Sequence, residues 1–219
     1  MNTADFQYIS KQFSEKKQHF NKGAFIYTPK QVVRKLFLVH EGIVKIGYYN
    51  NKDENVTKAI LYKGDVFSLP RLMQKEASAN YVEVISKEAQ ISTMSSTDFW
   101  SKIKDDVEFQ YLILDALTQR ITDLEKRWVW ITSLPTKKRV IAFIVDMGFR
   151  DGQKIGFETL VLNPFTHAEV GQFIGTSRQT ITTVMNQLQK ENLIYYNRKK
   201  ILIRDLKKLQ KIVWNNPEY

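Results

Sequence analysis

The residues whose chemistry stands out lie between Phe165 and Leu188. Thr166 and Glu169 have the spacing of a capping box, so a short helix is expected to begin there. Gly175 suits the left-handed backbone of a tight turn between two helices, and Ser177 is expected to start the second helix. Polar side chains of the kind that hydrogen-bond to phosphates and to base edges in the major groove then remain exposed. The residues expected to contact DNA in this segment are Thr166, Ser177, Arg178, Gln179, Thr180, Thr182 and Thr183.

A basic hairpin is expected directly after this segment. Two β-rich runs between Asn192 and Ile203 are joined by a polar tip, in which Arg198, Lys199 and Lys200 are expected to contact the phosphate backbone. Capping box, turn glycine, polar helix start and basic hairpin in this order predict a winged helix-turn-helix that binds double-stranded DNA. An RNA-binding regulatory protein is the alternative, although RNA-binding folds typically use aromatic platforms on sheets.

The charge distribution agrees with a polyanionic partner. The net charge of the 219 residues is +10, and it is uneven: 19 basic against 16 acidic residues up to Ser133, and 14 against 7 after it. A basic surface that only keeps the protein in solution would give the same numbers. Charge alone therefore does not decide between the two.

The residue types exclude several kinds of chemistry. The chain has no cysteine, which excludes disulfides, thiolate catalysis, cysteine-ligated zinc and ordinary iron–sulfur clusters. The three histidines are scattered, and His40, near the end of a strand, is expected at the surface or in a turn. No glycine-rich phosphate loop and no nucleophile elbow are present. We expect neither an enzyme nor a cofactor or bound metal.

The elements that position these residues differ between the two halves of the chain. From about Phe20 to Met94, short β-branched and aromatic runs separated by glycines and polar turns predict a sandwich or roll. The expected strands are Lys35–Val39, Ile43–Tyr49, Val56–Leu61, Tyr81–Ile85 and Gln90–Met94. Helix follows, with Ser96, Thr97 and Asp98 as candidate caps.

A long helix without glycine or proline is predicted between Asp106 and Ser133. Its large apolar residues recur at spacings of 3, 4, 3, 4 and 3, which is typical of a seam between two helices. These residues are Leu114, Leu117, Ile121, Leu124, Trp128 and Ile131. We expect them to form a homodimer interface; the alternative is an amphipathic face that packs within one chain.

Pro135 marks the expected hinge, and a second helix is predicted from Thr136 to Met147, capped by Gly148. The predicted layout is a β-rich domain over residues 1–105, a dimerisation helix with hinge over 106–134, and a DNA-binding domain over 135–219. The polar start of the chain and the lack of a long apolar run predict a cytoplasmic protein without a membrane partner.

The whole chain resembles the Crp/Fnr family of bacterial regulators. The most specific match is Gly175-Thr176-Ser177-Arg178-Gln179-Thr180-Ile181, which is similar to the start of the family's recognition helix. Phe20 with Gly23, the run from His40 to Lys45, and Gly64-Asp65 resemble its β-roll signature. The resemblance implies an α+β fold: an N-terminal double-stranded β-roll, a long dimerisation helix and a C-terminal winged helix-turn-helix. It also implies an inverted-repeat operator and RNA polymerase as a partner.

The chain departs from the family pattern where cyclic AMP would bind. Leu69 stands where cyclic-AMP-binding members have the glutamate for the ribose, and Ala79-Asn80 replaces the Arg-Ser pair that holds the phosphate. The expected effector pocket consists of Phe67, Leu69, Arg71, Ala79 and Asn80. We therefore expect an unidentified effector other than cyclic AMP, or constitutive activity. A cyclic-nucleotide-responsive regulator in which Arg71 holds the phosphate is the alternative.

The recognition helix departs from the pattern as well. Many relatives have glutamate, which suits cytosine, where this chain has Gln179, which suits adenine. Thr182-Thr183 stands where an arginine that reads guanine is common. The operator is thus expected to be richer in A·T pairs than the best-known family sites.

Overall fold

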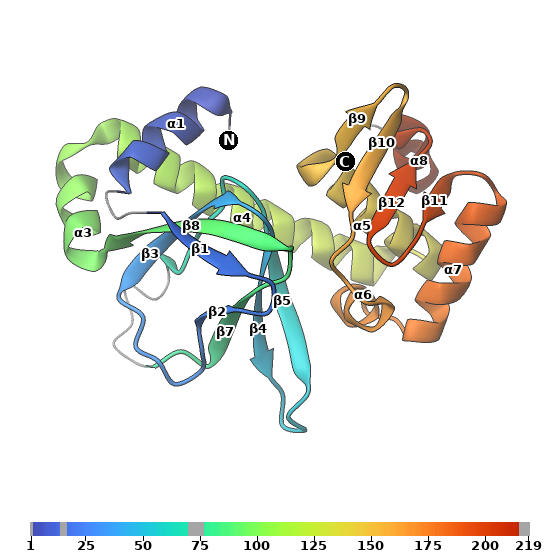
Figure 1. Cartoon of the computed structure of the whole chain (residues 1–219), viewed down its shortest axis with the longest axis horizontal. Coiled ribbons are helices and arrows are strands. Elements are labelled where there is room, and N and C mark those ends of the chain that lie inside the picture. Colours follow the sequence, from blue (N-terminus) through green and yellow to red (C-terminus); the bar gives the residue numbers. More distant parts are fainter. Residues whose placement is uncertain (1, 14–16, 70–76, 215–219) are drawn as a thin grey trace. The chain divides into compact units, whose positions relative to one another are not determined.

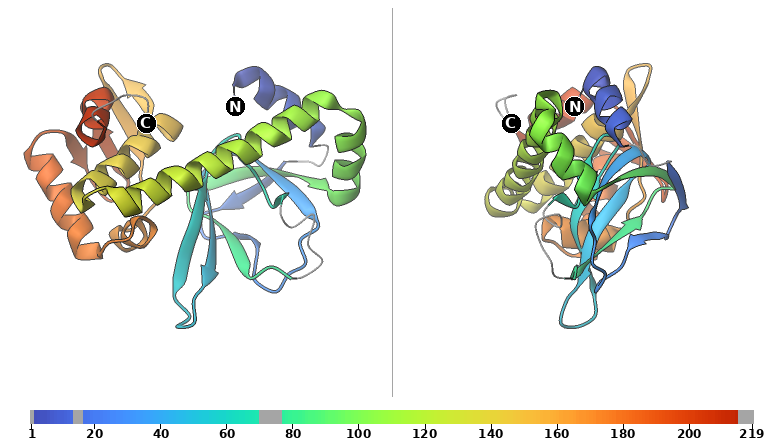
Figure 2. Two further views of the ribbon diagram at one scale, coloured as in Figure 1. Left: turned by 180° about the vertical axis from the view of Figure 1, so that it is seen from behind. Right: turned by 90° about the vertical axis from the view of Figure 1, so that its left-hand side faces the viewer.

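The computed structural model describes residues 2–13, 17–69 and 77–214. The chain divides into two compact units, Met1–Asp123 and Leu124–Tyr219. One continuous helix, α4 (Val107–Ser133), contributes residues to both units (Figures 1 and 2). Within the described residues, no helix has the length and apolar character to cross a membrane.

The first unit contains the predicted β-roll, built from two antiparallel sheets with the strand orders β1-β8-β3-β6 and β2-β7-β4-β5 (Figure 1). The five predicted strands are confirmed to within two residues at each end. Among its described residues the strands are β1 (Gln18–Asn21), β2 (Phe25–Tyr27), β3 (Lys35–Glu41), β4 (Val44–Tyr49), β5 (Asn55–Leu61), β6 (Val66–Phe67), β7 (Asn80–Val84) and β8 (Glu88–Ser95).

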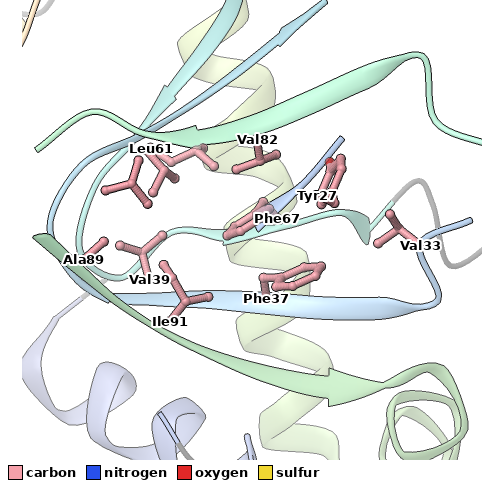
Figure 3. Close-up of a cluster of buried hydrophobic side chains, with 11 residues drawn as sticks. Tyr27, Val33, Phe37, Val39, Leu61, Phe67, Val82, Ala89 and Ile91 are labelled. Carbon is pink, nitrogen blue, oxygen red and sulfur yellow. The ribbon is translucent and has the colours of Figure 1, made fainter. Parts of the chain in front are cut away.

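The roll has its core between the two sheets. Side chains from both sheets meet there, and Figure 3 shows Tyr27, Phe37, Phe67, Val82 and Ile91 pointing toward one another. Because successive side chains of a strand point to opposite faces, Leu36 and Leu38 of β3 lie on the other face of their sheet.

Three helices cover that outer face (Figure 2). They are α1 (Thr3–Gln12), α3 (Ser96–Asp105) and the first turns of α4. Ile9, Phe99 and Phe109, one from each helix, pack with Leu36 and Leu38 in a second buried cluster. The N-cap of α3 is Ser95, whose Oγ accepts a hydrogen bond from the Asp98 amide at 3.1 Å, one residue before the predicted caps.

The expectation for His40 was wrong. This side chain lies on β3 and is only 3% exposed. Its Nε2 is 2.7 Å from the Ser92 hydroxyl of β8, and its ring meets the edge of Phe6 of α1 at 5.7 Å between centroids. Helix α1, which the sequence patterns did not reveal, covers this position, and the resulting burial lowers the pKa of the imidazole.

The second unit has the order of elements expected for a winged helix-turn-helix. After α4 come α5 (Thr136–Asp151), β9 (Gln153–Ile155), β10 (Glu158–Leu162), α6 (His167–Ile174), α7 (Arg178–Lys190), β11 (Ile194–Tyr196), β12 (Lys200–Ile203) and α8 (Leu206–Val213). The four strands form one antiparallel sheet in the order β11-β12-β10-β9. The hairpin of β9 and β10 was not predicted.

The predicted end of α5 at Gly148 was also wrong, because this glycine lies inside the helix and is buried. A Cβ atom at this position would be 2.7 Å from Cδ1 of Leu206 and 3.1 Å from Cδ1 of Ile203. Gly148 therefore allows α8 and β12 to approach α5 closely, and Gly152 is the residue that follows the helix end.

Candidate DNA-binding site

The helix-turn-helix of α6 and α7 is held by the caps that the sequence predicted. The Thr166 hydroxyl accepts a hydrogen bond from the Glu169 amide at 3.2 Å, and the Glu169 carboxylate accepts one from the Thr166 amide at 2.9 Å, which completes the capping box. Gly175 ends α6 with φ 71° and ψ 49°, the left-handed conformation. The Ser177 hydroxyl accepts a hydrogen bond from the Thr180 amide at 3.1 Å and caps α7.

A second glycine is required for the turn. A Cβ atom on Gly171 would lie 2.7 Å from the backbone oxygen of Thr176. The chain approaches so closely because both the Gly175 and the Thr176 amides donate to the Gly171 carbonyl, the latter at 2.8 Å. This hydrogen-bond pattern satisfies the end of α6 and directs the chain into α7.

Six of the predicted contact residues fall into two groups in the structure. Arg178 and Gln179, in the first turn of α7, and Thr183, one turn later, have exposed side chains. Thr166, Ser177 and Thr180 instead use their hydroxyl groups in the caps; the Ser177 and Thr180 hydroxyls are 2.8 Å apart. The residues of the second group therefore stabilise the N-termini of α6 and α7. The backbone amides of the first turns that remain without a partner in the helix are suited to bind phosphate.

Thr182 and Thr183 have their hydroxyl groups occupied by the helix itself. Thr182 donates to the Arg178 carbonyl at 3.0 Å, and Thr183 donates to the Gln179 carbonyl at 3.1 Å. Thr182 is also half-buried, whereas Thr183 is exposed. What Thr183 presents outward is therefore chiefly its methyl group, which suits contact with a thymine methyl.

The predicted wing is present between β11 and β12. Its tip contains Arg198 and Lys199, Lys200 begins β12, and all three side chains are exposed. The Asn197 side chain accepts hydrogen bonds from the Lys199 and Lys200 amides, both at 2.9 Å, and so shapes the tip.

Residues that sequence reasoning did not single out attach the wing and α6 to α7. His167 Nδ1 is 2.9 Å from the Thr182 hydroxyl, and the Tyr196 hydroxyl donates to Asn186 Oδ1 at 2.8 Å. Burial, and to a smaller degree the nearby Arg178 guanidinium, lowers the pKa of His167. The capping-box spacing placed His167 at the first position of α6, but nothing local in the sequence indicates a partner 15 residues later.

The apolar residues of α4 that were predicted to form a dimer interface are largely exposed within one chain. Trp128 is 69% exposed, Leu114 63%, Ile121 56% and Leu124 51%, while Leu117 and Ile131 are less exposed. Val107 and Tyr111, at 76% and 67%, extend the same stripe toward the start of the helix, which the sequence prediction missed. Large apolar side chains this exposed on one helix face are typical of an interface.

Four of the five residues predicted for an effector pocket lie among the described residues. Phe67 is 3% exposed and stacks on Phe37 in the roll core, since β6 pairs with β3. Leu69 packs against the second buried cluster, and Ala79 is exposed. The Asn80 side chain accepts a hydrogen bond from Lys58 at 3.3 Å, and Arg71 lies outside the described residues.

A pocket lined by described residues of the first unit lies between the turn from β5 to β6 and α4. Its volume is about 80 Å³, well below the several hundred Å³ typical of ligand sites. Its lining is mostly charged and polar, with Lys63, Asp65, Asp115, Arg120 and Asp123 among the residues.

Comparison with known proteins connects the two units to one family. The cyclic nucleotide-binding domain matches residues 17–106, and the Crp-like helix-turn-helix domain matches residues 138–212. The global nitrogen regulator of Synechococcus elongatus is 20% identical over 191 residues, which cover 85% of this chain and 84% of the relative. A probable transcriptional regulator of Lacticaseibacillus casei is 20% identical over 193 residues, covering 88% and 85%.

Solved structures show the same fold. A transcriptional regulator of the CRP/FNR family from Thermus thermophilus superposes with a TM-score of 0.73 at 19% identity, over 90% of this chain and 98% of the other. A CooA mutant from Carboxydothermus hydrogenoformans gives 0.71 at 21% identity, over 94% and 90%. The two matched domains together identify the chain as a member of the Crp/Fnr family, a DNA-binding transcription regulator with a cyclic-nucleotide-binding-like domain.

Proposed function

We propose that this regulator binds an inverted-repeat operator as a symmetric dimer, with the first turn of α7 in the major groove and the wing along the backbone. The observation that carries the proposal is the pair Arg178 and Gln179, exposed at the start of a fully capped recognition helix. Arginine and glutamine are the side chains that pair in bidentate fashion with guanine and adenine. Exposed Arg198, Lys199 and Lys200 on the wing add the sequence-independent attraction to phosphate.

The stripe on α4 is the proposed dimer interface. A twofold axis along Leu114, Leu117, Ile121, Leu124, Trp128 and Ile131 would cover side chains that one chain leaves exposed. Two recognition helices related in this way lie roughly 34 Å apart, one turn of DNA, which is why the operator is expected to be an inverted repeat.

The β-roll is proposed to sense an effector other than cyclic AMP, or to hold the regulator constitutively active. The positions that would bind ribose and phosphate are occupied by Leu69, Ala79 and Asn80, none of which offers a carboxylate or a guanidinium. The proposed division of the chain is a sensor over residues 1–105, a dimerisation helix over 106–134 and a DNA-binding domain over 135–219, which is called the reading head below. RNA polymerase is the proposed partner at the promoter, in the cytoplasm.

Selection of bound duplexes from a random pool tests the base-reading role. Gln179→Ala is expected to cost on the order of 1–3 kcal/mol per half-site and to relax preference at one symmetric base pair. Gln187→Ala is the matched control, because Gln187 is exposed on the same helix two turns later and hydrogen-bonds to Glu191. Unaltered preference in Gln179→Ala would refute this role, and equal binding of duplex RNA in competition would favour the RNA alternative.

A further inference from the structure

Two arginines hold the carbonyl groups at the end of α6. Arg127 Nε donates to the Phe173 carbonyl at 2.9 Å, and Arg139 Nη1 donates to the Ile174 carbonyl at 3.2 Å and to the Gly175 carbonyl at 3.0 Å. The last carbonyls of a helix have no partner within it, and the negative end of the helix dipole lies there. Guanidinium groups satisfy both demands, so the turn before α7 is fixed from outside the helix-turn-helix.

Arg127 makes a second contact with the same residue. Its guanidinium carbon lies 4.1 Å from the centroid of the Phe173 ring, which is the geometry of a cation–π interaction. The Phe173 ring in turn meets the edge of Phe143 of α5, with 5.8 Å between the centroids. Arg127 therefore packs against the aromatic pair of Phe173 and Phe143 in the DNA-binding domain.

The last turns of α4 also lie near the turn at another point. A Cβ atom built on Gly175 would lie 3.8 Å from Cγ2 of Ile131. Ile131 is one turn beyond Arg127, so two successive turns of α4 lie against the segment that joins α6 to α7. All of these residues belong to the second unit, Leu124–Tyr219.

The same two turns of α4 carry part of the apolar stripe. Leu124, three residues before Arg127, is 51% exposed, and Trp128, directly after it, is 69% exposed. The end of α4 therefore exposes apolar side chains that a second copy of the chain could cover. The same part of the helix places the Arg127 guanidinium against the turn between α6 and α7. An arginine suits this position because its planar group can stack and donate from Nε at once, which a lysine cannot.

We propose that Arg127 is a positioning residue that fixes each recognition helix relative to the dimer seam and so sets the half-site spacing that the regulator accepts. This inference rests on the proposed dimeric binding of an inverted repeat. Without the Arg127 contacts the turn would be attached to α4 less firmly, and the two reading heads would adapt to operators of different length.

Operators with altered spacing test this role. Arg127→Met keeps the aliphatic stem over Phe173 and removes the donor and the charge, and Arg127→Lys keeps the charge alone. Lys126→Met is the matched control, since Lys126 is the exposed neighbour on α4. Each protein is titrated with the best symmetric duplex, with duplexes one base pair shorter or longer, and with a single half-site, while light scattering measures the dimer.

Both Arg127 variants are expected to bind the best duplex on the order of tenfold more weakly and to lose about the same factor of discrimination between spacings. Half-site affinity, the dimer and the behaviour of Lys126→Met should be unchanged. Retained discrimination in Arg127→Met would overturn the proposal, and so would an equal loss on the half-site, which would make Arg127 a stabiliser of the reading head only. A lack of spacing preference in the unmodified protein would instead refute the proposed operator itself, and this inference with it.

Discussion

Leu124→Glu is the substitution that tests the dimer seam most directly. Leu124 is 51% exposed in one chain. Burying a whole leucine side chain contributes about 1.5–3 kcal/mol, so the exposed half is worth about 1 kcal/mol, or about 2 kcal/mol over two protomers. Glutamate forfeits this contribution and places two carboxylates near one twofold axis. Each loses hydration and repels the other, which adds at least a comparable cost.

The dimer should therefore be weakened by about 4 kcal/mol or more, roughly a thousandfold in its dissociation constant. Light scattering at micromolar concentration is expected to show monomers, and gel shifts should show that binding to the full operator disappears while weak binding to a half-site remains. Lys126→Glu is the control, because it introduces the same carboxylate on the opposite side of α4. A Leu124→Glu protein that remains dimeric would refute the seam, and a monomeric unmodified protein would make the stripe an intrachain face.

Four further predictions concern the turn, the roll and the wing. Gly171→Ala should reduce specific DNA binding and stability, since the added methyl group meets backbone; overpacking of about 1–3 kcal/mol exceeds the roughly 1 kcal/mol gained in helix propensity. The free energy of unfolding should fall as the pH drops below the unfolded pKa of about 6.5, because the lowered pKa of His40 gives stability that is present above this value and is lost as the pH falls toward the folded pKa. Lys199→Ala should weaken all DNA sequences alike and reduce the salt slope by about one for each phosphate that the wing no longer touches. Calorimetry with cyclic AMP should show no binding, because Ala79 and Asn80 cannot hold a cyclic phosphate.

The three substitutions each have a control on the same element or of the same type. Gln172→Ala, next to Gly171 and exposed, should bind DNA normally. His40→Gln should reduce the pH dependence and leave the part that His167 contributes, because the pKa of His167 is lowered by burial as well, whereas the exposed His19→Gln should keep it in full. Lys211→Ala, exposed on α8, should leave the salt slope unchanged. Sequence-selective effects of Lys199→Ala, or micromolar affinity for cyclic AMP, would contradict the roles given to the wing and to the roll.

Patterns local in the chain account for the features that were predicted correctly. Capping spacing, the turn glycine and the basic hairpin locate the helix-turn-helix, because their hydrogen bonds join residues at most a few positions apart. Strands of the roll were found in the same way, from composition and breaks.

Features set by distant partners were not predicted. His40 is buried by α1, whose apolar face matters only once it meets the roll, and Gly148 stays helical because α8 packs on it. The hydrogen bond from Arg127 to Phe173 spans 46 residues. No periodicity within a short window reports such interactions, since they depend on the packing of whole elements.

The packing of α8 onto α5 at Gly148 bears on how the chain is made. These helices lie near the two ends of the second unit, so its core is incomplete until the last described residues have left the ribosome. The β-roll, by contrast, has all its strands by Ser95. At a synthesis rate of about 5–20 residues per second, a nascent chain spends several seconds with a folded roll and no finished reading head. Chains whose synthesis stops before α8 therefore lack the residues that complete the core beneath the helix-turn-helix.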